Sequence, residues 1–276
     1  MSGSPEEMAA EFDTVAAWTA DVAADLDPAA RIPAGCRGSG SPGAMHWLLD
    51  HLRPERGQTF LDCGAGVGGP AAFAARETGV RPLLTDPEAG ACRAARSLFG
   101  LTTVRAGSRL PIAAGVIGVG WSLGVLCTVE DQRAFLAEIR RVLQPQARFG
   151  LIVYCAAHPG DLRLEPPEGN SFPTVEGLDD LLKEASLRVL TSGWTDDFAV
   201  LPTEWEDAME AVQAELERRH GPDPRWQTAE EQSTRMGSLL AAREVRGRLL
   251  VLQPGRDDHP RGRHGLRCLV AGCCLG

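Results

Sequence analysis

The most constraining feature of this chain is a glycine-rich turn that follows a short apolar run. Residues 60–70 read FLDCGAGVGGP, and an alanine-rich segment continues from there. Glycine lets the backbone turn sharply and approach a ligand where a Cβ atom would collide. A helix that begins near Pro70 offers unpaired N–H groups in its first turn. The pattern predicts a strand, a tight turn and a helix that together cradle a nucleotide.

A second apolar run ends in another carboxylate. Residues 81–86 read RPLLTD, so Asp86 closes the run. A carboxylate at the end of the second strand of such a unit can accept hydrogen bonds from both ribose hydroxyls. We therefore expect Asp86 to bind the ribose.

The glycines alone do not choose the nucleotide, because Gly64-x-Gly66-x-x-Gly69 also fits the dinucleotide fingerprint. Asp62 favours one ligand. Its carboxylate would repel the pyrophosphate of NAD, whereas it would attract the ammonium and sulfonium groups of S-adenosylmethionine (SAM). SAM is the predicted cofactor, and an NAD-dependent oxidoreductase is the disfavoured alternative.

Residues 34–155 resemble the class I SAM-dependent methyltransferases. Beyond the turn, the resemblance rests on Asp86-Pro87, Leu110-Pro111, residues 121–126 (WSLGVL) and residues 138–145 (EIRRVLQP). The order and spacing of these segments match the family. The resemblance implies an α/β, Rossmann-like class I methyltransferase fold, in which a mostly parallel seven-stranded sheet carries helices on both faces.

The resemblance also implies roles for single residues. Gly64 and Gly66 would line the methionine portion of SAM, and the adenine would lie near Pro87 and the turn at residues 106–108. Independently of the family, Arg37 could pair with the SAM carboxylate. The predicted cofactor-binding residues are Arg37, Gly38, Asp62, Gly64, Gly66, Asp86, Pro87, Gly107, Ser108 and Leu123.

Three segments depart from the family pattern. Where many relatives carry an acidic residue before the Leu-Pro pair, residues 105–108 read RAGS, so Ser108 or backbone groups must hold the adenine amino group. Residues 117–118 read IG where Phe-Asp is usual, and residues 145–147 read PQA where Pro-Gly-Gly is usual. These departures affect adenine affinity and loop geometry rather than the fold.

Periodicity predicts alternating strands and helices, which implies a parallel sheet covered on both faces. The predicted strands are 59–63, 81–85, 102–105, 117–123, 148–155, 187–191 and 246–252, the last at an edge. The predicted helices are 5–27, 42–52, 70–78, 88–99, 131–143, one that begins near Thr174, 203–220 and 228–243. Thr228 and Glu231 have the spacing of a capping box. Residues 32–42 are predicted to be a loop, since they are rich in glycine and serine.

Three regions follow from this pattern. Residues 1–54 form an N-terminal helical lid with a SAM-contacting loop, and residues 55–252 form the SAM-binding domain. Residues 203–243 are a helical insertion between two antiparallel strands that the family adds, and we expect them to set acceptor selectivity. Residues 253–276 form a flexible tail.

Only a few residues are candidates for binding the methyl acceptor or for removing its proton. Trp18 and Trp205 could wall an apolar acceptor pocket, although aromatic residues at helical spacing also serve as core. His158 follows the fifth strand and is the candidate catalytic base, because a histidine pKa suits proton removal at neutral pH. The alternative for His158 is an ordinary surface histidine. Tyr154 is predicted to belong to the core.

The composition of the chain disfavours several classes of function. A hydrophobic fraction of 43% with 24% charged residues is typical of a globular protein. The net charge of −9 argues against a nucleic-acid substrate. No apolar run is long enough to span a membrane, and the N-terminus lacks a signal peptide, which favours a cytoplasmic protein. The eight cysteines show no metal-ligand spacing, so no metal site is predicted.

These observations predict SAM-dependent methyl transfer to a small organic acceptor, by O-, C- or N-methylation, in specialised metabolism. The alternative is a SAM-binding protein without methyl transfer, either a regulatory partner or a cyclase that uses SAM as a charged cofactor. The partner is a small-molecule acceptor, with no nucleic acid and no membrane. The oligomeric state is open, a homodimer included.

Overall fold

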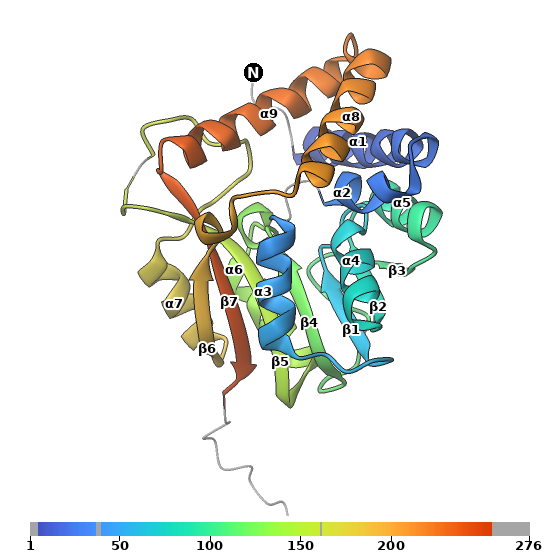
Figure 1. Ribbon diagram of the computed structural model, residues 1–276. Coiled ribbons are helices and arrows are strands. Elements are labelled where there is room, and N and C mark those ends of the chain that lie inside the picture. Colours follow the sequence, from blue (N-terminus) through green and yellow to red (C-terminus); the bar gives the residue numbers. More distant parts are fainter. Residues whose placement is uncertain (1–4, 37–39, 161, 256–276) are drawn as a thin grey trace, which may run out of the picture.

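A seven-stranded sheet forms the centre of the molecule (Figure 1). The structure is a computed structural model that describes residues 5–36, 40–160 and 162–255. The strands have the order β3-β2-β1-β4-β5-β7-β6. Their bounds are β1 Thr59–Cys63, β2 Arg81–Asp86, β3 Thr102–Arg105, β4 Ile117–Leu123, β5 Leu143–Ala156, β6 Leu187–Trp194 and β7 Val245–Pro254.

Strand direction confirms the mostly parallel sheet. β1 pairs in parallel with β2 and β4, and β3 and β5 extend the parallel part on either side. β7 is antiparallel to both β5 and β6. The prediction of an edge strand at 246–252 was wrong, because β7 lies between β5 and β6 and is buried along most of its length. Only β7 runs against the other six strands, so the expectation of two antiparallel strands was also wrong.

Helices cover both faces of the sheet. α3, α4 and α5 pack on one face, and α6 and α7 pack on the other. The helix bounds are α1 Pro5–Asp25, α2 Arg31–Gly35, α3 Pro42–Leu52, α4 Gly69–Thr78, α5 Ala89–Phe99, α6 Gln132–Val142, α7 Val175–Glu184, α8 Thr203–His220 and α9 Pro224–Ala241. The fold predicted from the family resemblance is therefore confirmed.

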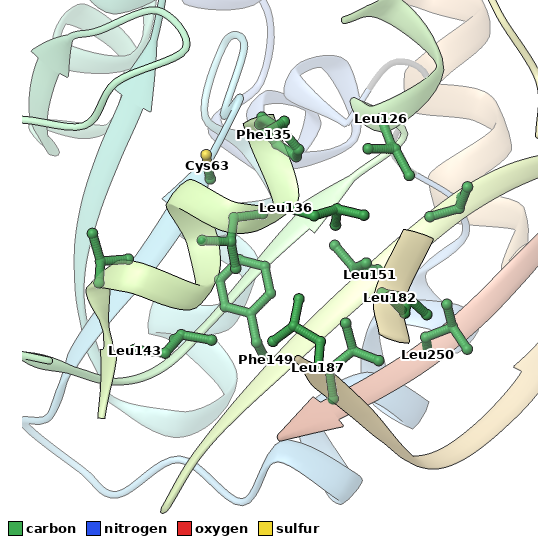
Figure 2. Close-up of a cluster of buried hydrophobic side chains, with 14 of the residues drawn as sticks. Cys63, Leu126, Phe135, Leu136, Leu143, Phe149, Leu151, Leu182, Leu187 and Leu250 are labelled. Atoms are coloured by element: carbon green, nitrogen blue, oxygen red, sulfur yellow. The ribbon is translucent and has the colours of Figure 1, made fainter. Parts of the chain in front are cut away.

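The larger core lies between the sheet and the α6–α7 face (Figure 2). Leu136 of α6 and Leu182 of α7 meet Phe149 and Leu151 of β5, and all four are almost completely buried. α6 places its apolar residues at helical spacing, so one stripe faces this core. Burying such side chains stabilises the fold by about 1.5–3 kcal/mol each, which holds the ends of β4 and β5 in place.

Four helices lie together beyond the carboxyl ends of the parallel strands. α1, α2, α8 and α9, which we call the helical cover, gather at the top of the view in Figure 1. α1 contacts α2, α8 and α9, and α2 contacts α8 and the start of α4. The helices α8 and α9 come from the segment between β6 and β7, as the sequence predicts. In the helical cover, the N-terminal helices α1 and α2 thus pack against the inserted helices α8 and α9 over one end of the sheet.

Three local predictions were wrong, each because of a tertiary or capping contact. Residues 31–35 form α2 instead of a loop, because Gly35 packs directly on the backbone of Gly69. α9 begins at Pro224, where Asp223 accepts the backbone N–H of Arg225, and the Thr228 hydroxyl donates to a carbonyl inside the helix. β7 continues to Pro254, beyond the predicted start of the tail at 253. Residues 256–276 lie outside the described residues.

Candidate functional site

The glycine turn leaves the end of β1 and enters α4 at the carboxyl edge of the sheet. The backbone N–H groups of Gly64 and Ala65 donate to the Thr85 carbonyl at 2.8 and 3.1 Å, which ties the turn to β2. Gly64 has a φ of +76°, and a Cβ there would lie 2.4 Å from Val125 Cγ2. Gly66 also has positive φ, but a Cβ on it would meet no atom within 4 Å. Val125 thus excludes a side chain at position 64, whereas the space next to Gly66 is free of protein atoms.

Asp86 lies at the end of β2 and braces this turn. Its Oδ2 accepts the Gly66 N–H at 2.8 Å, and its Oδ1 accepts the Glu88 N–H at 2.9 Å. Burial raises the pKa of this carboxyl group, while the two N–H donors oppose the shift and the charge of Asp13 adds to it. Each carboxylate oxygen keeps a second lone pair, so Asp86 can still accept ribose hydroxyls.

Asp62 lies one position before the end of β1 and is only 2% exposed. Its Oδ2 is buried and has no hydrogen-bond partner among the described residues. Burial raises the pKa of Asp62 to about 7, the Trp121 indole opposes the shift, and the charge of Asp86 adds to it. A buried carboxylate without a partner is costly, so this oxygen is suited to a ligand that brings a positive charge or a donor.

SAM fits this arrangement better than NAD does. An ammonium group at Asp62 would supply the missing partner, whereas a pyrophosphate there would face a carboxylate. The open side of Gly66 leaves room above the turn, and Asp86 stands at the next strand end. The parallel strands end at this point, where ligands bind in doubly wound sheets. The chemistry of the donor set therefore supports the SAM prediction.

The predicted adenine-side residues lie at the rim of the site. Pro87, Gly107 and Ser108 are exposed, and the Ala106 N–H donates to the Asp86 carbonyl at 2.9 Å, which holds this turn next to β2. Leu123 is buried at the end of β4. Arg37 and Gly38 lie outside the described residues. Contacts of all these residues with SAM stay predictions.

The helical cover reaches the cofactor site from two sides. Asp13 of α1 accepts the Gly90 N–H through Oδ1, so it acts as a cap for α5. A Cβ on Gly90 would also lie 2.2 Å from the Asp13 carbonyl oxygen, which shows how closely α1 approaches. On the other side, Cys36 at the end of α2 lies near Asp62, whose charge together with burial raises the pKa of the Cys36 thiol. The helical cover therefore packs closely around the ends of β1 and β2.

The aromatic candidates for the acceptor pocket are held by neighbouring helices. Trp18 stacks on His220 with ring centroids 4.0 Å apart, and Arg225 lies over the same ring. Trp205 is 8% exposed and meets the Phe73 ring edge-on at 6.0 Å. These contacts explain how both rings pack, and their role in acceptor binding stays a prediction.

His158 and Tyr154 lie near the carboxyl end of β5. His158 is exposed in the loop after that strand. Tyr154 is half-buried at the border of the core, and burial raises the pKa of its hydroxyl to about 12. Tyr154 therefore stays protonated at neutral pH, which leaves His158 as the candidate base.

Sequence reasoning missed two residues that lie next to the predicted site, Asp13 and Trp121. Asp13 lies in an amphipathic helix, and nothing in its local pattern indicates that it caps α5. Trp121 could have been found, because it precedes the end of β4 by two positions and so shares a sheet face with Leu123. Its register partner is Asp62.

The described residues contain no group of three metal-ligating side chains, and five cysteines there are buried and unpaired. No helix within that part of the chain is long and apolar enough to cross a membrane.

Comparison with known proteins supports the same interpretation. Residues 61–151 match a family described as a methyltransferase domain. The chain is 30% identical over 118 residues to methyltransferase phqN of Penicillium fellutanum, a match that covers 38% of this chain and 35% of that protein. The chain thus matches only about a third of the length of this curated relative.

Solved structures share the fold at low sequence identity. A [4+2]-cyclase, SpnF, has a TM-score of 0.60 at 19% identity, covering 76% of this chain and 79% of the other. A putative sarcosine dimethylglycine methyltransferase from Galdieria sulphuraria has a TM-score of 0.59 at 16% identity, covering 76% and 84%. A geranyl diphosphate C-methyltransferase from Streptomyces coelicolor A3(2) has a TM-score of 0.53 at 14% identity, covering 76% and 74%. Residues 61–151 thus carry a methyltransferase domain, and most of the chain has the fold of these solved structures.

Proposed function

We propose that this protein transfers the methyl group of SAM to a small organic acceptor in specialised metabolism. The observation that carries the proposal is the buried, unpartnered carboxylate oxygen of Asp62 beside the glycine turn, with Asp86 at the adjacent strand end. The match of residues 61–151 to a methyltransferase domain, and similar solved structures that hold SAM or S-adenosylhomocysteine, support SAM as the cofactor. The net charge of −9 supports a small acceptor rather than a nucleic acid.

The chain's own residues mainly bind and orient. SAM supplies an electrophilic methyl group on a sulfonium. Asp62 would hold the ammonium end and Asp86 the ribose, and the acceptor would bind toward the ends of β4 and β5, where His158 follows β5. Holding both reactants in line can contribute up to about 7–11 kcal/mol. An oxygen or carbon acceptor would also need its proton removed, for which His158 is the proposed base.

SAM binding is tested directly by titration calorimetry. Asp86→Asn keeps the size of the side chain but removes its charge, and the amide nitrogen cannot accept a hydrogen bond. We expect SAM affinity to fall about 10-fold or more, because a hydrogen bond to a charged group is worth about 1.5–3 kcal/mol. Asp50→Asn, at an exposed site on α3, is the matched control and should bind SAM like the unchanged protein. Absence of SAM binding by the unchanged protein would refute the proposed function.

Methyl transfer is tested separately from binding. Incubation with isotopically labelled SAM and pools of small metabolites should give labelled products and S-adenosylhomocysteine, both detected by mass spectrometry. His158→Gln should then lower kcat for an oxygen or carbon acceptor while leaving SAM affinity unchanged. For an amine acceptor that arrives unprotonated, the same substitution should have little effect.

A second candidate function is SAM binding without methyl transfer, as a regulatory partner or a cyclase. It is supported by the fold shared with the [4+2]-cyclase and by the RAGS segment at residues 105–108. Tight SAM binding without release of S-adenosylhomocysteine from any acceptor pool would favour it. A cytoplasmic location stays a prediction, which cell fractionation tests, and light scattering measures the oligomeric state that the sequence leaves open.

A further inference from the structure

Trp121 and Asp62 lie side by side on neighbouring strands at the floor of the cofactor site. They are register partners in the β1–β4 ladder, so their side chains point to the same face of the sheet. That face carries α3 and α4. Phe60, two residues before Asp62, meets the Trp121 ring edge-on at 4.9 Å with an interplanar angle of 87°. The indole therefore packs against Phe60 and lies beside Asp62 in the strand register.

Both partners carry a buried polar atom that the fold leaves unsatisfied. Trp121 is fully buried, and its Nε1 has no hydrogen-bond partner among the described residues. The same is true of Asp62 Oδ2. Nε1–H is only a donor, and a carboxylate oxygen is only an acceptor. Buried tryptophan N–H groups usually find a partner, so a donor and an acceptor left unpaired on adjacent strands form a complementary pair.

We propose that Trp121 is a positioning residue for SAM, whose indole N–H holds the Asp62 carboxylate in the orientation that receives the ammonium group. This inference rests on the proposed SAM site. Trp121 itself lies beside Asp62 on the neighbouring strand and acts through its carboxylate. The role is distinct from core packing, because it depends on the N–H group and not on the volume of the ring.

Electrostatics of the pocket agree with this role. The Trp121 indole lowers the pKa of Asp62 against the larger effect of burial, so it stabilises the charged form that an ammonium group requires. Among the described residues, the charge that acts on the pKa of Asp62 is that of Asp86, while Arg76 on α4 acts on the neighbouring Cys36 and lowers the pKa of its thiol against the larger effect of burial. Asp86 on β2 is acidic, and burial raises the pKa of the thiols of Cys36 on α2 and Cys63 on β1.

SAM binding should consequently be coupled to a proton. With its pKa at about 7, Asp62 is about half protonated at pH 7 in the empty protein, and binding of an ammonium group requires the carboxylate. We expect binding at pH 7 to release about half a proton, and the Kd to rise as the pH falls below 7. The Kd for SAM should be measured between pH 6 and 7.5, because the α-amino group of SAM itself loses its proton at higher pH, near the usual α-amino pKa of about 7.7–8.0.

A double-mutant cycle separates positioning from packing. Titration calorimetry with SAM is performed on the unchanged protein, Trp121→Phe, Asp62→Asn and the double variant. Trp121→Phe should raise the Kd about 10-fold or more at pH 7. In the Asp62→Asn background the same change should have no further effect, since the indole then has no carboxylate to orient. Equal losses in both backgrounds, or no loss in either, would overturn the proposal.

A second measurement does not require a Trp121 variant to fold. The chain has six tryptophans, whose indole N–H groups give separate NMR signals after ¹⁵N labelling. One signal should shift with pH with a midpoint near 7 in the unchanged protein and stay constant in Asp62→Asn. If no indole signal shows this difference, the proposal is wrong. Failure of the unchanged protein to bind SAM would instead count against the proposed function, so the two failures are distinguishable.

Discussion

Asp62 shows at the scale of a single residue how a binding site conflicts with stability. Its carboxyl group is 2% exposed, and burial raises its pKa from 3.8 to about 7. Between these two values the folded protein binds a proton that the unfolded chain releases, so this group makes the protein less stable as the pH rises from about 4 to 7. The shift corresponds to at most about 4 kcal/mol, reached above pH 7.

We therefore expect Asp62→Asn to stabilise the empty protein. The gain in unfolding free energy should be larger at pH 7.5 than at pH 5, because the charged form that the substitution removes is present only at the higher pH. Urea unfolding at both values measures the difference. If the variant proves less stable than the unchanged protein at pH 7.5, the buried charge of Asp62 does not destabilise the folded protein as we expect.

Elements at this site are held by contacts between distant parts of the chain. Glu88 precedes α5 but its side chain does not cap it, and the Gly90 N–H is taken by Asp13 of α1 instead. Arg93 of α5 also lies 3.6 Å from the Asp13 carboxylate. The α1–α5 contact thus couples the helical cover to the strand end that carries Asp86.

Gly90→Ala tests this contact against a matched control. In a helix interior, Gly→Ala normally stabilises by about 0.5–1 kcal/mol, and this gain is expected for Gly237→Ala on α9, where a Cβ meets no atom within 4 Å. At Gly90 the new Cβ would lie 2.2 Å from the Asp13 carbonyl oxygen, so α1 must move. We expect Tm to fall for Gly90→Ala and to rise for Gly237→Ala. Faster proteolysis within α1 should accompany the fall, and equal changes in both variants would argue against a close α1–α5 contact.

At the scale of the whole molecule, the helical cover closes a site whose floor belongs to the sheet. Asp62 and Asp86 are both buried in the described structure, and we expect part of the cover to move when SAM enters. Such openings are local and cost less than global unfolding. A ligand that binds only the closed form stabilises it by about 2.7 kcal/mol at a concentration of 100 times Kd.

Hydrogen exchange should localise this movement. Saturating SAM is expected to slow amide exchange in α1, α2 and the turn at residues 64–69. α7 lies on the opposite face of the sheet. Its amides that exchange through local openings, in which SAM stays bound, should show little change in exchange rate. Mass spectrometry of the intact, full-length protein with and without SAM gives the comparison. A uniform change across α1 and α7 would show that exchange in both requires global unfolding.

Sequence alone was sufficient for the existence of the strands and most helices, and it placed Asp62 and Asp86 at the ends of neighbouring strands. β1 and β2 are short apolar runs that end near Asp62 and Asp86, and parallel strands present their carboxyl ends at one edge. The glycine turn was recognisable because positive φ and close approach require glycine. These are local properties, carried by residues adjacent in the chain.

Tertiary structure decided what depends on distant neighbours. Three contacts illustrate the point: Gly35 packs on Gly69, Asp13 of α1 caps α5 through the N–H of Gly90, 77 positions away, and Trp121 meets Asp62 only through strand pairing. The position of β7 inside the sheet was likewise not apparent from its own residues. The physical reason is that hydrophobic pattern and turn chemistry act over a few residues, whereas burial, register and the pKa of Asp62 are set by groups that folding brings together.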